Sequence, residues 1–231
     1  MAGPAAASRV FDRWLAVEVR PFLAKRGWHR RASTFLLPTQ QNTGLLVFQK
    51  SKWNDARTCR FTIEVDLFSP RLARYDAEDL GLDLPDRPTR GYGSMARRLT
   101  SLMGEEDLWW TVRSSALSLE LESLGSGVRD KIEQFALPYV AARLTDEAIR
   151  DEMLARLDEC GPNALRLLRR LVEDLGPRGR LPDIETAATA ARALVDAERA
   201  QALADMAAAW ERQDEEDVAA ADAGMQRLLG R

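Results

Sequence analysis

Two carboxylates, Glu64 and Asp66, are the residues whose type and spacing most directly suggest catalytic chemistry. They lie two positions apart in the segment from Arg60 to Phe68, where apolar and polar residues alternate as in a half-buried strand. Side chains two apart on a strand share a face and lie about 7 Å apart. Such a pair could bind Mg²⁺ or divide the roles of acid and base between two carboxyls. The alternative is a solvated sheet face, with Arg60 or Lys50 neutralising the pair.

Basic and aromatic side chains are interleaved in the first 60 residues. The set comprises Lys25, Arg26, Trp28, His29, Arg30, Arg31, Lys50, Lys52, Trp53, Arg57 and Arg60. Cations neutralise phosphates and aromatic rings stack on bases, so this composition indicates nucleic-acid or phosphate binding. The phosphate ligands would then be Arg30, Arg31, Lys50 and Lys52. Against this, the sequence shows no RNA-binding signature and no helix-turn-helix spacing, and Trp28 follows a helix-ending glycine, where an aromatic side chain commonly fills the core.

His29 is the only histidine, and Cys59 and Cys160 are the only cysteines. A Ser-His-Asp or Cys-His device would therefore have to use His29, with Cys59 as the better-placed thiol. The cations Arg26 and Arg30 near His29 make it a weak proton acceptor, which favours a surface or core-edge role. So few cysteines and histidines exclude a zinc finger, a Cys/His metal cluster and a disulfide-stapled scaffold. We expect no metal and no other cofactor.

Four tryptophans are candidate anchors for a protein partner, because an exposed indole is typical of interface hot spots. They are Trp53, Trp109, Trp110 and Trp210. Adjacent residues of a strand point to opposite faces, so of Trp109 and Trp110 one indole is expected in the core and the other beneath a helix or at an interface.

The elements that must position these side chains begin with a helix. Ser8 can cap a helix that runs from Arg9 to about Arg26, is kinked at Pro21 and ends at Gly27. Four strands are expected next, joined as an antiparallel meander. They cover residues 34–37, 45–50, 60–68 and 108–112.

Proline, glycine and aspartate are frequent in residues 69–106, which therefore look loop-like with short helical pieces. The glycine pair at 125 and 127 is interpreted as a turn, and the pattern is helical from about residue 115. The predicted fold class is thus α+β: a small antiparallel sheet of about four strands packed by an N-terminal helix, followed by a helical C-terminal half.

Three segments are expected along the chain. Residues 1–145 form the α+β domain, residues 146–176 a helical extension, and residues 183–231 an alanine-rich helical hairpin, which follows a Gly/Pro/Arg linker. Alanine supports helix formation but offers little area for burial. The hairpin, which includes Trp210, therefore either packs against the main domain or serves as an arm that docks a partner.

The charge distribution and the hydropathy of the chain bear on its expected cellular location. The 231 residues carry a net charge of −3, but residues 1–60 hold 11 basic and 3 acidic side chains, so the N-terminal part is basic and the rest acidic. The first residues lack the features of a secretory signal, and no apolar stretch approaches the roughly 20 residues of a membrane span. We expect a cytoplasmic protein with no membrane contact.

Several short motifs resemble those of a known family. They are Arg20-Pro21-Phe22-Leu23, Gly27-Trp28-His29-Arg30-Arg31, Ser33-Thr34-Phe35, Val47-Phe48-Gln49-Lys50-Ser51-Lys52, Phe61-Thr62-Ile63, Trp109-Trp110 and Ala136-Leu137-Pro138. With these residues, about 8–145 of the chain resembles the bacterial family called domain of unknown function 4304. The family often has Asn where this chain has Glu64. The resemblance implies an intracellular α+β domain and supplies no catalytic residues.

Three classes of function remain, in this order. The first is a non-enzymatic binding or regulatory module that docks a macromolecular partner, above all a protein. The second is nucleic-acid or phosphate binding through the basic N-terminal surface. The third is a metal-assisted enzyme that uses Glu64 and Asp66. The order reflects the lack of catalytic parts, so the sequence argues against an enzyme more than it argues for any one partner.

Overall fold

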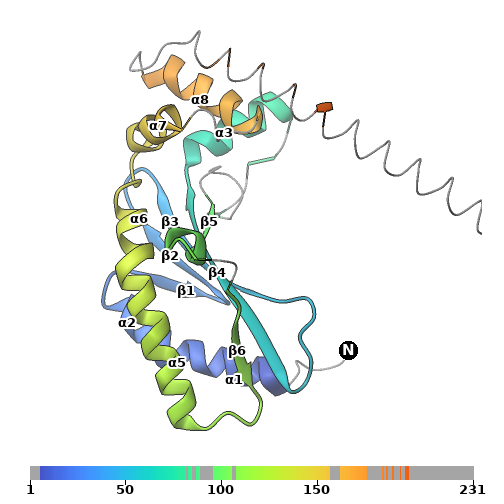
Figure 1. Cartoon of the computed structure of the whole chain (residues 1–231). Coiled ribbons are helices and arrows are strands. Elements are labelled where there is room, and N and C mark those ends of the chain that lie inside the picture. The colour runs from blue at the N-terminus through green and yellow to red at the C-terminus, as the bar shows by residue number, and fades with distance from the viewer. Residues whose placement is uncertain are drawn as a thin grey trace, which may run out of the picture.

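The protein combines one antiparallel sheet with helices along one face and a group of helices at one end (Figure 1). The computed structural model describes residues 6–81, 83–84, 87–88, 96–105, 108–156 and 162–175, with a few positions between 184 and 197. The α+β fold class predicted from the sequence is confirmed. Trp210 and most of the predicted hairpin at 183–231 lie outside the described residues.

Within the part of the chain that the structure describes, the sheet has six strands rather than about four. They are β1 (His29–Arg31), β2 (Thr34–Pro38), β3 (Thr43–Lys50), β4 (Thr58–Phe68), β5 (Arg97–Arg98) and β6 (Trp110–Arg113). Strands β1 to β5 pair antiparallel in that order, and β6 also pairs with β4. The two unpredicted strands, β1 and β5, span three and two residues. Segments this short cannot show an alternating hydrophobic pattern, so their absence from the prediction has a simple cause.

The N-terminal helix is interrupted at the place where its proline predicts a kink. It consists of α1 (Ala6–Trp14), a π-helical turn η1 (Leu15–Val19) and α2 (Arg20–Ala24). The backbone N–H of Arg20 donates to the carbonyl of Leu15, five residues earlier, and Pro21 follows at once. Proline has no N–H and its ring crowds the carbonyl four residues before it, so the wider turn absorbs the mismatch.

The same device recurs in the second long helix, which packs beside the first (Figure 1). Helix α5 (Ser118–Lys131), the π turn η2 (Ile132–Ala136) and α6 (Leu137–Ala141) form one path, with Pro138 after the π turn. The glycines predicted as a turn lie inside α5. Gly125 is buried there, and a β-carbon on it would come within 2.8 Å of the Glu18 side chain. The small residue thus permits close approach of the two helices.

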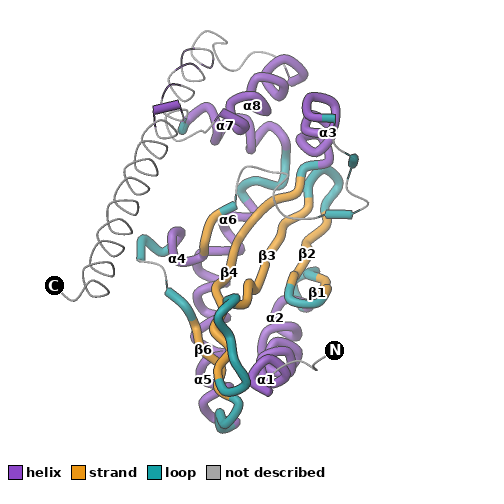
Figure 2. The backbone as a smooth tube through the Cα atoms, turned by 90° about the vertical axis from the view of Figure 1, so that its right-hand side faces the viewer, coloured by secondary structure: helices purple, strands orange, loops and turns teal. Residues whose placement is uncertain are grey.

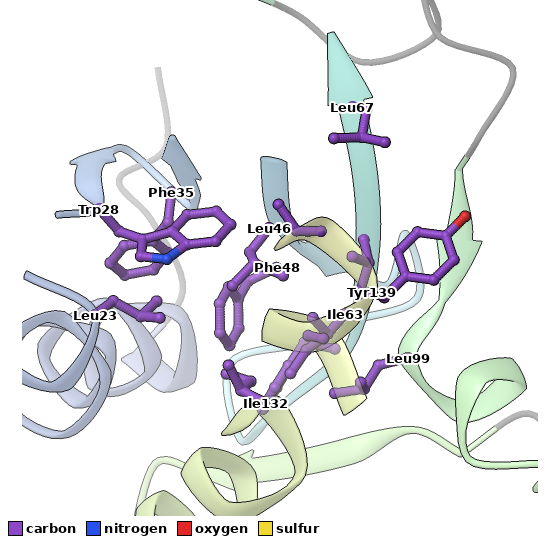
Figure 3. Packing of buried hydrophobic residues seen from close by; sticks show 14 of the residues in the cluster. Leu23, Trp28, Phe35, Leu46, Phe48, Ile63, Leu67, Leu99, Ile132 and Tyr139 are labelled. Carbon is purple, nitrogen blue, oxygen red and sulfur yellow. The ribbon is translucent and has the colours of Figure 1, made fainter. Parts of the chain in front are cut away.

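Aromatic and aliphatic side chains from one face of the sheet fill the space beneath these helices (Figure 3). The central rings are Phe11, Trp14, Phe48 and Phe61, with centroid distances of 4.9 to 6.3 Å. The indole N–H of Trp14 donates to the Leu121 carbonyl at 3.0 Å, so its polar group is satisfied in the core. Trp28 is buried as well, as the sequence suggests.

Three helices gather at the far end of the sheet. They are α3 (Pro70–Leu80), α7 (Asp146–Ala155) and α8 (Pro162–Leu175). Residues 69–106 are expected to be loop-like with short helical pieces, and α3, with 11 residues, is longer than such a piece. Ser69 caps it by accepting from the N–H of Leu72, Pro70 occupies its first turn, and Gly81 ends it at φ 65°. Among the described residues, no helix is long and apolar enough to cross a membrane.

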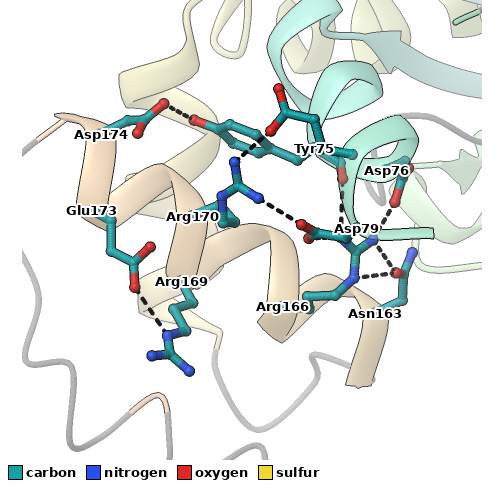
Figure 4. A network of polar contacts seen from close by, with 10 residues as sticks. Tyr75, Asp76, Asp79, Asn163, Arg166, Arg169, Arg170, Glu173 and Asp174 are labelled. Atoms are coloured by element: carbon teal, nitrogen blue, oxygen red, sulfur yellow. Dashed lines mark hydrogen bonds and ion pairs between the residues drawn. The ribbon is translucent and has the colours of Figure 1, made fainter. Parts of the chain in front are cut away.

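Ion pairs join α3 to α8 (Figure 4). Arg166 of α8 pairs with Asp76 and Asp79, and Arg170 pairs with Asp79 and Glu78. These contacts, together with apolar packing, attach the predicted extension at 146–176 to the sheet domain through α3.

Candidate functional site

The loop between β3 and β4 holds an indole in solvent on an ordered backbone. The side-chain amide of Asn54 donates to the carbonyl of Arg60 at 2.9 Å and accepts from its N–H at 2.7 Å, which mimics a strand pair. Asp55 accepts from the N–H groups of Arg57 and Thr58 at 2.8 and 2.7 Å. Trp53, which lies between the end of β3 and Asn54, is 82% exposed.

Two other elements brace this loop from either side (Figure 2). The N–H of Ala7, in α1, donates to the carbonyl of Ala56 at 3.1 Å, and the N–H of Ser114, after β6, donates to the carbonyl of Arg57 at 2.8 Å. The loop therefore does not need to order itself on binding, which lowers the entropic cost of using Trp53 as a contact.

Cations and indoles alternate from this loop along β4. The ammonium of Lys52 lies 5.1 Å from the Trp53 ring centre. The side chain of Asn54 bonds to the backbone of Arg60. The guanidinium of Arg60 lies 5.8 Å from the ring centre of Trp109. Arg98 of β5 lies at the same distance from that ring. We call Lys52, Trp53, Arg60, Trp109 and Arg98 the basic–aromatic row.

The two adjacent tryptophans divide between the faces of the sheet. Trp110 stacks on Phe61 of the core with centroids 5.8 Å apart and is half-buried. Trp109 is half-buried and faces Arg60 and Arg98. Of the four candidate partner residues, Trp53 is exposed, Trp109 and Trp110 are half-buried, and Trp210 lies outside the described residues.

A separate open pocket of about 610 Å³ is lined by α1, β1, the turn after β1, and β3. Its lining includes the polar residues Asp12, Arg30, Ser33, Gln49 and Lys50. Two of the four predicted phosphate ligands, Arg30 and Lys50, thus reach one pocket from different strands. Its size is ordinary for a ligand site.

Both cations of the pocket are held in place. Lys50 donates to Ser8 Oγ at 2.6 Å and to Asp12 Oδ1 at 3.0 Å. Arg30 donates from Nε to the carbonyl of Ala32 at 2.8 Å. Ala32 has φ 50° in the two-residue turn between β1 and β2, a conformation that costs an alanine of order 1 kcal/mol and that tertiary contacts must maintain.

The other two predicted phosphate ligands lie elsewhere. Arg31 lines an adjoining pocket of about 290 Å³, which shares Ala32 and Val47 with the first. Lys52 belongs to the β3–β4 loop. The predicted set of four is therefore split over three places rather than gathered around one phosphate.

Glu64 and Asp66 share a face of β4, as their spacing requires, but that face is not freely solvated at this point. Asp66 is 1% exposed and accepts from the N–H of Leu67 at 2.8 Å, while Glu64 lies opposite Arg98 in the strand register. Lys50, proposed as a neutraliser, pairs with Phe61 and so points to the other face. Within the described part of the chain no group of three or more Asp, Glu, His or Cys could hold a metal ion.

The proposed thiol–imidazole pair is not assembled. His29 lies exposed on the edge strand β1, and Cys59 is buried on β4, with two strands between them. Burial raises the pKa of the Cys59 thiol, and the nearby charge of Lys50 only partly opposes this. A protonated, buried thiol is a poor nucleophile. Cys160 lies outside the described residues.

Comparison with known proteins gives a family and no activity. No curated protein and no solved structure matches the chain significantly. The family described as Domain of unknown function (DUF4304) matches residues 19–142, from η1 to the end of α6, which is more than half of the chain. This range contains the whole sheet and the basic–aromatic row, and it ends before α7 and α8. The chain belongs to the DUF4304 family.

Proposed function

We propose that the chain is a non-enzymatic binding module that docks a macromolecular partner through the tip of the β3–β4 hairpin. The observation that carries this is the exposure of Trp53 on an ordered loop. An indole has roughly 200 Å² of surface, so leaving it in water forgoes roughly 4 kcal/mol of apolar burial. Asn54 and Asp55 fix the backbone of this loop. The fixed loop holds the Trp53 ring in solvent rather than against the neighbouring sheet.

The charges around the hairpin tip indicate that the partner is negatively charged. From residue 51 to residue 60 the chain has three basic side chains, Lys52, Arg57 and Arg60, and one acidic side chain, Asp55. Asp55 is occupied by two backbone N–H groups. We place this activity in the bacterial cytoplasm, in agreement with the family resemblance and with a free Cys59 thiol.

The test is affinity purification of the full chain from its own cells, in three forms. Trp53→Ala removes the indole, and Leu80→Ala removes an exposed apolar side chain at the opposite end of the molecule as a matched control. We expect a partner that is recovered with the unmodified chain and with Leu80→Ala, and lost with Trp53→Ala. Equal recovery by all three forms, at equal circular dichroism, would contradict the proposal.

Phosphate binding in the pocket of Arg30 and Lys50 is a second candidate, because the fold brings these two predicted ligands together. Asp12 partly neutralises Lys50, so a bound phosphate must compete with this ion pair. Titration with inorganic phosphate, followed by amide chemical shifts, should perturb residues of the pocket and be abolished by Arg30→Ala. Uniformly unchanged shifts would remove this candidate.

A further inference from the structure

We propose that the partner of the basic–aromatic row is single-stranded nucleic acid, with bases stacking on Trp53 and Trp109 and phosphates contacting Lys52, Arg60 and Arg98. This inference rests on the proposed docking function of the hairpin and names the chemistry of its partner.

Alternation of rings and cations is the first argument. Lys52 lies against Trp53, and Arg60 and Arg98 lie against Trp109, so each indole is within 6 Å of at least one cation. A single strand presents the same alternation, since each base plane is joined to the next by one phosphate. Proteins that bind single strands combine stacking rings with a positively charged track in this way.

Arg60 connects the two halves of the row. Its backbone is bonded to Asn54, the residue after Trp53, and its guanidinium faces Trp109. Arg60 therefore links the loop that carries Trp53 to the ring of Trp109, although the two indoles come from different parts of the chain. Arg113 adds an exposed cation beside the loop, since it pairs with Thr58 in the register of β6 and β4.

Exposure of the indole face distinguishes a single strand from a duplex. In a duplex the base planes are covered by their neighbours, so an aromatic side chain can stack only after base pairs open. In a single strand the base planes are available at little cost. Removing an aromatic ring that stacks on them clearly lowers the affinity. The exposed indole of Trp53 can therefore stack on a base of a single strand without the opening of any base pair.

The experiment measures fluorescence anisotropy of labelled oligonucleotides of about 20 nucleotides, as single-stranded DNA, single-stranded RNA and duplex, with the purified full chain at about 50 mM salt. We expect both single strands to bind more tightly than the duplex, with affinity falling as salt rises. Trp53→Ala should weaken binding about 5- to 150-fold, whereas Trp53→Phe retains most of it. Lys52→Ala and Arg60→Ala should each lower the salt slope by about 0.7.

Arg169→Ala is the matched control, because Arg169 is an exposed arginine on α8, away from the row. It should leave affinity and salt slope unchanged. Equal binding by Trp53→Ala and the unmodified chain, or duplex binding as tight as that of single strands, would overturn the inference. If no oligonucleotide binds, the inference is also wrong, while the docking function is decided separately by the affinity purification, where a protein partner lost with Trp53→Ala would still support it.

Discussion

Arg166 of α8 joins the helical extension to the family domain, and replacing it with methionine should destabilise the protein more than its partial exposure suggests. Its guanidinium pairs with Asp76 and Asp79 of α3 and donates to Asn163 Oδ1 at 2.7 Å (Figure 4). The side chain of Asp76 is only 7% exposed, whereas that of Arg166 is 25% exposed. Methionine retains the apolar stem and removes the charge.

The magnitude follows from what Asp76 loses. Removing one partner of a buried ion pair costs about 3 to 5 kcal/mol, and an exposed pair is worth about 0 to 1 kcal/mol. Asp79 keeps Arg170, bonded at 2.5 Å, so its own loss is small. Because Arg166 is partly solvated, we expect Arg166→Met to lower the free energy of unfolding by about 2 to 3 kcal/mol, between the two limits.

Urea denaturation of the full chain, followed by circular dichroism, measures this free energy. Arg169→Met is the control, since its pair with Glu173 is exposed and should be worth less than about 0.5 kcal/mol. In the double variant with Asp76→Asn, much of the loss should be recovered, because no buried charge is then left without its partner. A loss with Arg166→Met no greater than with Arg169→Met would refute the assignment of this pair as the main polar link.

Three further outcomes are expected. Gly44→Ala should destabilise the fold by about 1 to 3 kcal/mol in the same urea assay, because its β-carbon would lie 2.5 Å from a methyl group of buried Val140. Burial raises the pKa of Tyr75 to about 12, above the ordinary value of about 10. The neutral phenol of Tyr75 therefore contributes fully to stability below about pH 10, and this contribution is lost as the pH rises toward 12. Tyrosinate absorbance, with Tyr75→Phe as the control, measures this. Cys59 should react with iodoacetamide at pH 8 only after unfolding in a Cys160→Ser background, and rapid native labelling would contradict its burial.

Local sequence signals account for much of the fold. The alternation of Phe61, Ile63 and Val65 against Thr62 and Glu64 predicts strand β4, and the structure confirms it. Such a signal works on a strand long enough to repeat the alternation, because the core face must then be apolar at every second residue.

Helix α3 shows how a strong local signal can be outweighed by composition. Ser69 followed by Pro70, with Gly81 eleven residues after Pro70, is a helix start and stop. The many Pro, Gly and Asp residues that follow obscure this signal, because their composition predicts a loop-like segment with only short helical pieces. A separate reading of caps would have found α3, but not β5, whose two residues are a strand only because β4 offers an edge.

Only part of the basic–aromatic row can be predicted from the sequence, again because β5 lies in a segment with loop-like composition. Trp53, Lys52 and Arg60 are neighbours in sequence and were selected for their chemistry, and so was Trp109. Arg98 was not, because it lies in the segment predicted as loop, and only pairing of β5 and β6 with the same edge of β4 brings it to Trp109. Asn54 was also missed, since nothing in sequence shows that its amide will bond to the backbone of Arg60.

Strand register explains why the acidic pair and the phosphate ligands cannot form one site. Lys50 pairs with Phe61, so the even-numbered residues of β3 share a face with the odd-numbered residues of β4. Lys50 therefore points toward α1, and Glu64 points to the opposite face. A change of one residue in the β3–β4 loop would reverse this relation, and the alternating pattern of either strand alone cannot reveal it. The row and the pocket thus lie at separate places on the sheet, and a variant in one should leave the other intact.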